Sequence, residues 1–312
     1  MKPSRFLAAG LQASVSASAS ASASASASFA RPTSLPHPTP AQLRSHLATS
    51  SPTSLHLPDL VSSWPALRSW TLGDGLAPLR EAVGEDMGVD IEMGPRGRGY
   101  LDERYRRVTM GFGLFLDAFI LNRIPSTTDT ATKVALPTAY LAQSDLPPHP
   151  IFERDTPSLP HFSCGPRGEV YRRTLWVGPG GSFTPFHRDP YIGIYSQVIG
   201  TKTFHVLPPE AERFLDINPQ PPHTNTSQIP ISVSALFSST SLPTAGHPAP
   251  PPEPELDAGT LSRYRAALAE AAKLPGACEA RLGPGQSLLV PEGWWHSAEG
   301  IETGVGINAW FR

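Results

Sequence analysis

The chain has 312 residues, with 25 basic and 27 acidic side chains and a formal charge of -2. This balance gives no basic face of the kind that a phosphate backbone requires, so nucleic acid is not an expected ligand. The two cysteines, Cys164 and Cys278, lie far apart without C-x-x-C spacing, which argues against a disulfide framework and a structural zinc site. The sequence has no run of 18 apolar residues, so a membrane-spanning helix is not expected.

The N-terminal region has a strongly biased composition. Residues 13–30 alternate Ser and Ala almost perfectly, and a Pro-, Ser- and Thr-rich stretch continues to about Pro58. Because few bulky apolar residues offset the entropy of ordering, we predict a disordered tail over residues 1–52 and one domain over 53–312. The tail has basic residues but no acid before Asp59, as in mitochondrial and other transit peptides. The alternative is a tail without an address, in a protein of the cytoplasm or nucleus.

The domain begins with helical patterns and continues with strand patterns. Apolar residues at helical spacing predict short helices at 79–83 and 114–121, which form a small helical layer. From Arg172 onward, runs rich in Val, Ile, Thr and aromatic residues alternate with Gly and Pro, which predicts an antiparallel sandwich or barrel. Its strands are expected at residues 175–177, 192–199, 202–207, 287–290 and 305–311.

A proline-rich segment interrupts the strand pattern. Residues 208–254 contain twelve prolines and no convincing period, so we predict a surface insertion there. A helix is expected to follow over residues 257–273, with Asp257 or Thr260 as its N-cap. Its predicted buried stripe consists of Leu261, Tyr264 and Leu268.

A candidate metal site begins with the segment T-P-F-H-R-D-P, residues 184–190. Residues two apart on a strand share a face, so His187 and Asp189 can converge on one point. Iron(II) in oxygen-activating sites takes two histidines and one carboxylate and keeps other positions open. His296 is the best second histidine, because it follows a turn, P-E-G-W-W, that leads out of the strand at 287–290. The H-x-D pattern alone is weak, since the chain has ten histidines.

One of only four lysines strengthens this hypothesis. Lys202 starts the second strand of a predicted hairpin that turns at Gly200 and Thr201. An ammonium group inside a barrel needs an anionic partner, and a dicarboxylate cosubstrate is such a partner. The alternative is a hairpin lysine that points into solvent.

Together these residues resemble the JmjC (jumonji-C) cupin-like oxygenases, in particular the small single-domain JmjC protein hydroxylases. The resemblance covers roughly residues 55–312 apart from the proline-rich insertion, and W-P-A-L-R-S-W (64–70) is similar to the segment before the barrel in that subgroup. It implies a mainly β fold, a double-stranded β-helix (jelly-roll or cupin-like barrel) with flanking helices. It rests on A-Y-L-A-Q (139–143), W-V-G-P-G-G-S-F-T-P-F-H-R-D-P (176–190), Q-V-I-G-T-K (197–202), P-G-Q-S-L-L-V-P-E-G-W-W-H (284–296) and N-A-W-F (308–311).

The resemblance also implies the cofactors, Fe(II) and 2-oxoglutarate, and their contacts. The implied iron ligands and catalytic residues are His187, Asp189 and His296. The implied contacts to the distal carboxylate of 2-oxoglutarate are Lys202, Tyr140 and Thr184. Many relatives place an asparagine four residues after the ligand aspartate, where this chain has Gly193. Asn308 either compensates near the metal-bound end of the cosubstrate or simply packs in the sheet.

The implied reaction is hydroxylation of a protein or peptide side chain with O2. Glu92, Tyr100 and Trp176 match positions that line the substrate pocket in the arginyl-hydroxylating subgroup. A carboxylate beside aromatic faces suits a guanidinium, although a solvated acid and two core aromatics are the alternative. Other hypotheses are a JmjC-type histone demethylase, which the lack of a Cys/His zinc cluster disfavours, an RNA-base hydroxylase, and a non-catalytic metal-binding cupin-like module.

Overall fold

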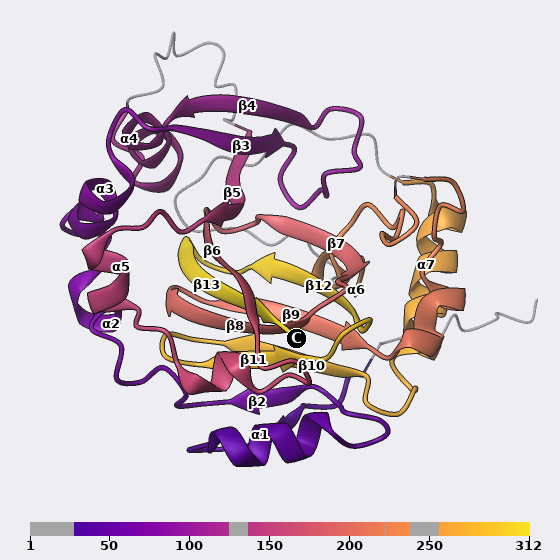
Figure 1. The fold of residues 1–312 in the computed structure, drawn as a ribbon. Coiled ribbons are helices and arrows are strands. Elements are labelled where there is room, and N and C mark those ends of the chain that lie inside the picture. The colour runs from indigo at the N-terminus through magenta and orange to yellow at the C-terminus, as the bar shows by residue number, and fades with distance from the viewer. Residues whose placement is uncertain (1–27, 125–136, 222, 238–255) are drawn as a thin grey trace, which may run out of the picture.

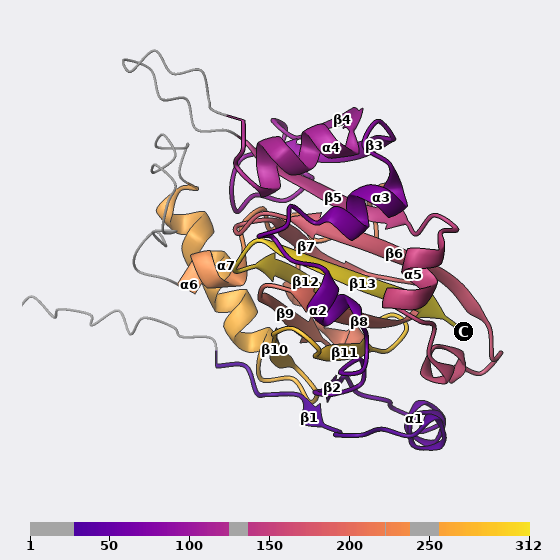
Figure 2. The ribbon, with the colours of Figure 1, turned by 90° about the vertical axis from the view of Figure 1, so that its left-hand side faces the viewer.

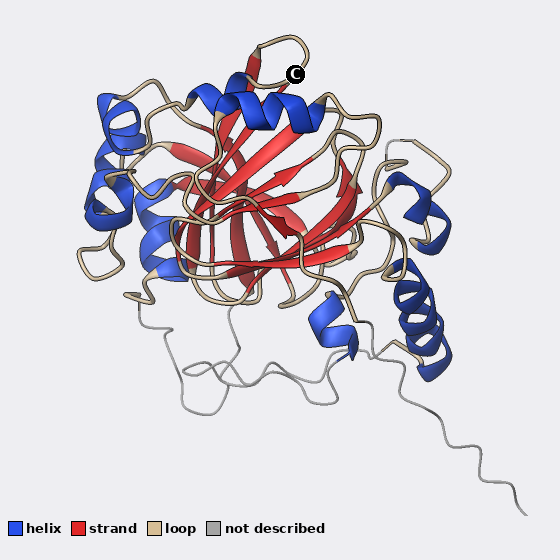
Figure 3. Ribbon diagram, turned by 90° about the horizontal axis from the view of Figure 1, so that it is seen from below, coloured by secondary structure: helices blue, strands red, loops and turns tan. Residues whose placement is uncertain are grey.

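The computed structural model describes residues 28–124, 137–221, 223–237 and 256–312, which form two β-sheets with helices around them (Figure 1). The larger sheet has nine strands in the order β1-β2-β11-β8-β13-β6-β5-β3-β4, and the smaller has four in the order β10-β9-β12-β7. Seen from below, the strands gather at the centre and the helices lie outside them (Figure 3). The predicted mainly β, cupin-like barrel is confirmed.

The strands pair antiparallel, except for β1 with β2. The larger sheet consists of β1 (Thr33–Ser34), β2 (Leu55–Leu57), β3 (Gly88–Gly94), β4 (Arg106–Gly111), β5 (Thr138–Asp145), β6 (Val170–Gly178), β8 (Ile192–Ile199), β11 (Ser287–Val290) and β13 (Gly304–Phe311). The smaller consists of β7 (Phe183–Arg188), β9 (Lys202–Leu207), β10 (Cys278–Leu282) and β12 (Trp295–Gly300). Each strand predicted from the sequence lies within or coincides with one of these.

Helices cover the outer side of each sheet. On the larger sheet these are α2 (Ala66–Ser69), α3 (Ala77–Val83), α4 (Phe112–Phe115), a π-helical turn (Leu116–Ile120) and α5 (Pro150–Asp155), and Figure 2 looks onto this side. Leu175 and Val177 of β6 point into this layer, where Trp64 and Phe115 are buried. The intervening Trp176 points the other way, because successive side chains of a strand alternate between its faces. The predicted helical layer is therefore confirmed.

Residues 28–51 are more ordered than their composition predicts. Helix α1 (Pro40–Leu47) begins with a capping box in which Thr39 and Gln42 bond each other's backbone. Leu43 is fully buried, and His161 donates a hydrogen bond to the carbonyl of Pro38. The prediction of disorder is thus wrong for this segment. The prediction used the average composition, whereas a few specific contacts are enough to offset the entropy cost of ordering. Residues 1–27 lie outside the described residues.

Replacing Leu43 with alanine is expected to lower the free energy of unfolding by about 2–4 kcal/mol, because the side chain leaves a cavity. Urea denaturation measures this change. Ser45→Ala is the matched control, since Ser45 is exposed on the same helix. Equal stability of the two variants would mean that α1 does not pack on the domain in solution.

The proline-rich segment is only partly a surface insertion. It contains a 3-10 helix (Pro209–Phe214) and α6 (Val233–Phe237), and Ile229, Val233 and Leu236 are buried. These side chains join the core between the smaller sheet and α7 (Ala258–Ala271), so irregularly spaced apolar residues still find a partner surface. Residues 222 and 238–255 lie outside the described residues.

Helix α7 itself is as predicted. The side chain of Asp257 accepts a hydrogen bond from the backbone N–H of Thr260, and Tyr264 and Leu268 are buried while Leu261 is partly buried. Within the ranges that the structure covers, no helix has both the length and the apolar character needed to cross a membrane.

Candidate active site

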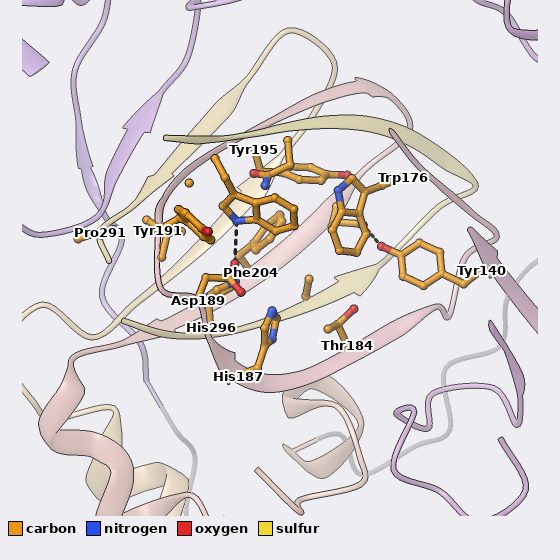
Figure 4. Close-up of a pocket in the computed structure, with 16 residues that line it drawn as sticks. Tyr140, Trp176, Thr184, His187, Asp189, Tyr191, Tyr195, Phe204, Pro291 and His296 are labelled. Carbon is orange, nitrogen blue, oxygen red and sulfur yellow. Dashed lines mark hydrogen bonds and ion pairs between the residues drawn. The ribbon is translucent and has the colours of Figure 1, made fainter. Parts of the chain in front are cut away.

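A cavity lies between the two sheets. Its walls come from β5, β6, β8, β11 and β13 of the larger sheet and from β7, β9 and β12 of the smaller one, and six of its 16 lining residues are phenylalanine, tyrosine or tryptophan (Figure 4). All three predicted metal ligands and all four predicted cosubstrate contacts line this one cavity.

Strand pairing brings the three candidate metal ligands together. His187 on β7 is the register partner of His296 on β12, and Asp189 follows two residues after His187 on the same face. The candidate ligand atoms all lie within 4.8 Å of one another, and Oδ2 of Asp189 is 3.8 Å from Nε2 of His296. The predicted convergence of residues more than a hundred positions apart is therefore confirmed.

Both imidazoles present Nε2 to the cluster. Nδ1 of His187 donates to the carbonyl of Pro185 at 2.9 Å, and Nδ1 of His296 donates to that of Trp294 at 3.2 Å. Such bonds select the tautomer whose Nε2 lone pair is free for a metal. Burial, aided by the neighbouring His187 and opposed by Asp189, lowers the pKa of His296 to about 4, so its ring is neutral near pH 7. Two imidazoles that present Nε2 and one aspartate side chain fit the donor set of Fe(II).

Lys202 lies at the other end of the cavity inside an aromatic cage. Its Nζ donates to the hydroxyl of Tyr140 at 2.8 Å and lies 4.9 to 5.7 Å from the ring centroids of Tyr140, Trp176 and Tyr195. Burial lowers the pKa of this amine to about 7. No carboxylate pairs with it among the described residues, so the site offers one buried ammonium to an incoming anion.

The hydroxyl groups around Lys202 fit a polar ligand. Thr184 lines the cavity and bonds the Tyr140 hydroxyl, whose pKa is raised by burial. The buried hydroxyl of Tyr195 has no hydrogen-bond partner among the described residues, which is costly unless a ligand supplies one. Tyr195 was not singled out from the sequence, because a tyrosine in a strand is usually an ordinary core residue.

Two glycines make room for these rings. A Cβ atom at Gly178 would overlap the ring of Tyr140, and one at Gly306 would overlap the hydroxyl of Tyr195. Side chains at either position would therefore displace the cage around Lys202.

Asn308 lines the cavity but its amide is engaged within the larger sheet. In the orientation that satisfies both ends of the amide, the NH2 group donates to the carbonyl of Ile194 and the oxygen accepts from Nε1 of Trp310, both at 3.2 Å. Gly193 leaves space beside both side chains. The predicted contact of Asn308 with the cosubstrate stays a prediction.

Of the three candidate substrate residues, Glu92 and Tyr100 are not among those that line the cavity. Trp176 lines the cavity, and its indole donates to Thr174 at 2.9 Å. Glu92 on β3 is the register partner of Tyr140, and burial raises the pKa of its carboxyl. Burial, with the charge of Glu92 as a further cause, raises the pKa of Tyr100. Their predicted role in substrate binding stays a prediction.

Tyr100 is held by a residue that sequence reasoning missed. Its hydroxyl lies 3.0 Å from the hydroxyl of Thr226, which is 2% exposed. Backbone hydrogen bonds attach this segment to β7 on either side of His187, from Ser227 to Phe186 at 2.7 Å and from Arg188 to Asn225 at 3.1 Å. Part of the proline-rich segment thus adds to the edge of the smaller sheet beside a candidate metal ligand.

Comparison with known proteins agrees with this geometry. A family model described as a cupin-like domain matches residues 38–312. The chain belongs to the cupin-like domain family. It is 24% identical over 256 residues to "Lysine-specific demethylase JMJ30" of Arabidopsis thaliana. The aligned region covers 80% of this chain and 48% of that protein.

Other relatives carry different names. "Lysine-specific demethylase 8" of Xenopus tropicalis is 23% identical over 82% of this chain and 47% of its own length. "HSPB1-associated protein 1" of Homo sapiens is 33% identical over 45% of this chain and 23% of its own length. The chain therefore spans about half the length of the first two relatives. The resemblance to JmjC cupin-like oxygenases is confirmed, and Fe(II) and 2-oxoglutarate are the cofactors of these proteins.

Proposed function

We propose that this chain is an Fe(II)- and 2-oxoglutarate-dependent dioxygenase that hydroxylates a protein side chain, with arginine as the target. The observation that carries the proposal is the presence, in one cavity, of a two-histidine, one-carboxylate cluster and a buried lysine without a carboxylate partner among the described residues. A purely structural core has no physical reason to bury both, because each costs folding free energy unless a ligand compensates it.

Two groups of residues in the cavity would bind the metal and the cosubstrate. His187, Asp189 and His296 would hold the iron, which together with 2-oxoglutarate supplies the oxygen-activating chemistry. Lys202, with the hydroxyls of Tyr140 and Thr184, would bind the distal carboxylate through charge-assisted hydrogen bonds. The aromatic walls exclude water and restrict the pose of the bound groups.

Glu92 supports an arginyl substrate. Its side chain is partly buried, and burial raises the pKa of its carboxyl, with Arg107 as the opposing charge. An incoming guanidinium would pair with this carboxylate and lie against tyrosine rings, since the charge of Glu92 reaches both Tyr100 and Tyr140.

Lysine demethylation is the second candidate, favoured by the names of two relatives. It uses the same metal site, so the products distinguish the two reactions. Succinate release should be measured with Fe(II), 2-oxoglutarate and peptides that differ only in arginine, lysine or N-methyl-lysine. A gain of one oxygen on arginine supports the proposal, whereas formaldehyde release from N-methyl-lysine supports demethylation. A protein that binds Fe(II) and 2-oxoglutarate but releases no succinate in the presence of any protein or peptide would favour a non-catalytic module.

Replacing Glu92 with glutamine should raise the KM for an arginyl peptide about 30-fold, because losing one partner of a buried ion pair costs about 2 kcal/mol. The KM for 2-oxoglutarate should not change, and steady-state kinetics measure both. Asp90→Asn is the matched control, since Asp90 lies on the same face of β3 but is 54% exposed. Equal peptide KM values for the two variants would contradict the assigned role of Glu92.

A further inference from the structure

The carboxylate of Asp189 has a hydrogen-bond donor of its own on the far side of the cavity. Nε1 of Trp310 donates to Oδ2 of Asp189 at 2.8 Å, a bond that Figure 4 marks by a dashed line. Oδ2 is also the oxygen that lies 3.8 Å from Nε2 of His296. The indole therefore bonds the carboxylate oxygen that faces the second histidine.

We propose that Trp310 is a positioning residue for the metal site, which fixes the carboxylate of Asp189 in the orientation that faces the two histidines. This inference rests on the proposed metal site. It assigns a role to a side chain that would otherwise count only as an aromatic wall of the cavity.

The sheet places Trp310 beside a glycine of the neighbouring strand β8. In β13, Trp310 is the register partner of Gly193 in β8 and of Arg172 in β6. A Cβ atom at Gly193 would already contact Cδ1 and Nε1 of the indole at 3.7 Å.

Two neighbours hold the indole itself. The ring of Trp176 meets it edge-on, with centroids 6.5 Å apart and planes at 70°. In the amide orientation described above, the oxygen of Asn308 lies 3.2 Å from the same Nε1 and shares its N–H with Asp189. Trp310 is 7% exposed, so its N–H has little access to water as an alternative partner.

The backbone of Asp189 is held separately from its side chain. Its carbonyl accepts a hydrogen bond from the N–H of Gly293, in the turn that leads to His296. This bond ties the two ligand-bearing segments together but leaves the rotation of the carboxylate free. The indole N–H restricts that rotation, and carboxylate orientation is what partners of metal ligands generally control.

Loss of such a partner typically weakens metal binding about 10- to 100-fold. The full chain should be titrated with Mn(II), with the free ion measured by electron paramagnetic resonance. Trp310→Phe removes the N–H together with part of the ring. Benzothienylalanine at position 310 keeps a bicyclic ring and removes only the N–H. Trp70→Phe is the matched control, because that buried indole also donates to an aspartate, Oδ2 of Asp155 at 2.9 Å, but does not line the cavity.

We expect the Kd for Mn(II) to rise about 10- to 100-fold in both position-310 variants and to stay within about threefold of the wild type in Trp70→Phe. A benzothienylalanine variant that binds Mn(II) as tightly as the wild type overturns the inference, even if Trp310→Phe does not fold. An equal loss in Trp70→Phe also overturns it, since the effect would then follow from the loss of any buried indole. If the wild type binds Mn(II) but hydroxylates no peptide, the proposed reaction fails while the role of Trp310 stands.

Discussion

The His296→Ala variant is expected to lose 2-oxoglutarate turnover by more than about a thousandfold, because metal catalysis contributes several kcal/mol and about 4 kcal/mol corresponds to that factor. The imidazole is the only one of the three ligands that comes from β12, so its loss leaves two donors from a single segment. Succinate formation measures the turnover, and the metal content of the dialysed protein measures binding independently.

His205→Ala serves as the matched control for this experiment. His205 is also a buried histidine of the smaller sheet, but it bonds Glu279 and packs against Phe29 instead of facing the cavity. Its loss is expected to reduce stability and to leave the metal content at that of the wild type. Full metal content in His296→Ala, or equal metal loss in both variants, would contradict the assigned ligand set.

The candidate metal site could be predicted because its signal is local and geometric. Residues two apart on a strand share one face, so the sequence predicts that His187 and Asp189 converge on one metal ion. The same alternation explains why Trp295 packs outward against α7 while His296 faces the cavity. Register between β7 and β12 then completes the cluster, although β12 is not among the strands predicted from the sequence.

Features that depend on contacts between distant segments could not be predicted in this way. The segment around Thr226 has no strand period, because it forms an isolated bridge with β7, bonded through Asn225 and Ser227. Helix α1 lies in a stretch with few bulky apolar residues. It is held by the buried Leu43, its capping box and the hydrogen bond from His161 to Pro38. The bond from Trp310 to Asp189 joins residues 121 positions apart, and no spacing rule reports such a pair.

Lys202 is expected to destabilise the cosubstrate-free protein and to be essential once the cosubstrate binds. Burial lowers its pKa from 10.5 in the unfolded chain to about 7 in the folded protein. Between these values the unfolded state binds more protons, so the stability cost is complete below about pH 7 and fades as the pH rises toward 10.5. A bound dicarboxylate would compensate this cost, because it supplies the missing negative charge.

The Lys202→Met variant should therefore show two effects of opposite sign. Without cosubstrate, its free energy of unfolding should exceed that of the wild type by roughly 1–4 kcal/mol at pH 6, since an uncompensated buried charge is replaced by an apolar chain. Its affinity for 2-oxoglutarate should fall at least about 30-fold, because one partner of a buried charge pair is worth about 2 kcal/mol or more. Urea denaturation measures the first effect, and titration calorimetry with Mn(II) present measures the second.

The pH dependence of binding separates this explanation from a simple packing change. In the wild type the amine is increasingly neutral above about pH 7, so binding of the dianion must take up a proton and the affinity should fall as the pH rises. Calorimetry in two buffers of different ionisation enthalpy detects that proton. Lys202→Met should show no uptake, whereas Lys273→Met, which removes a lysine that is 69% exposed, should behave as the wild type. Unchanged cosubstrate affinity in Lys202→Met would show that the buried amine does not receive the distal carboxylate.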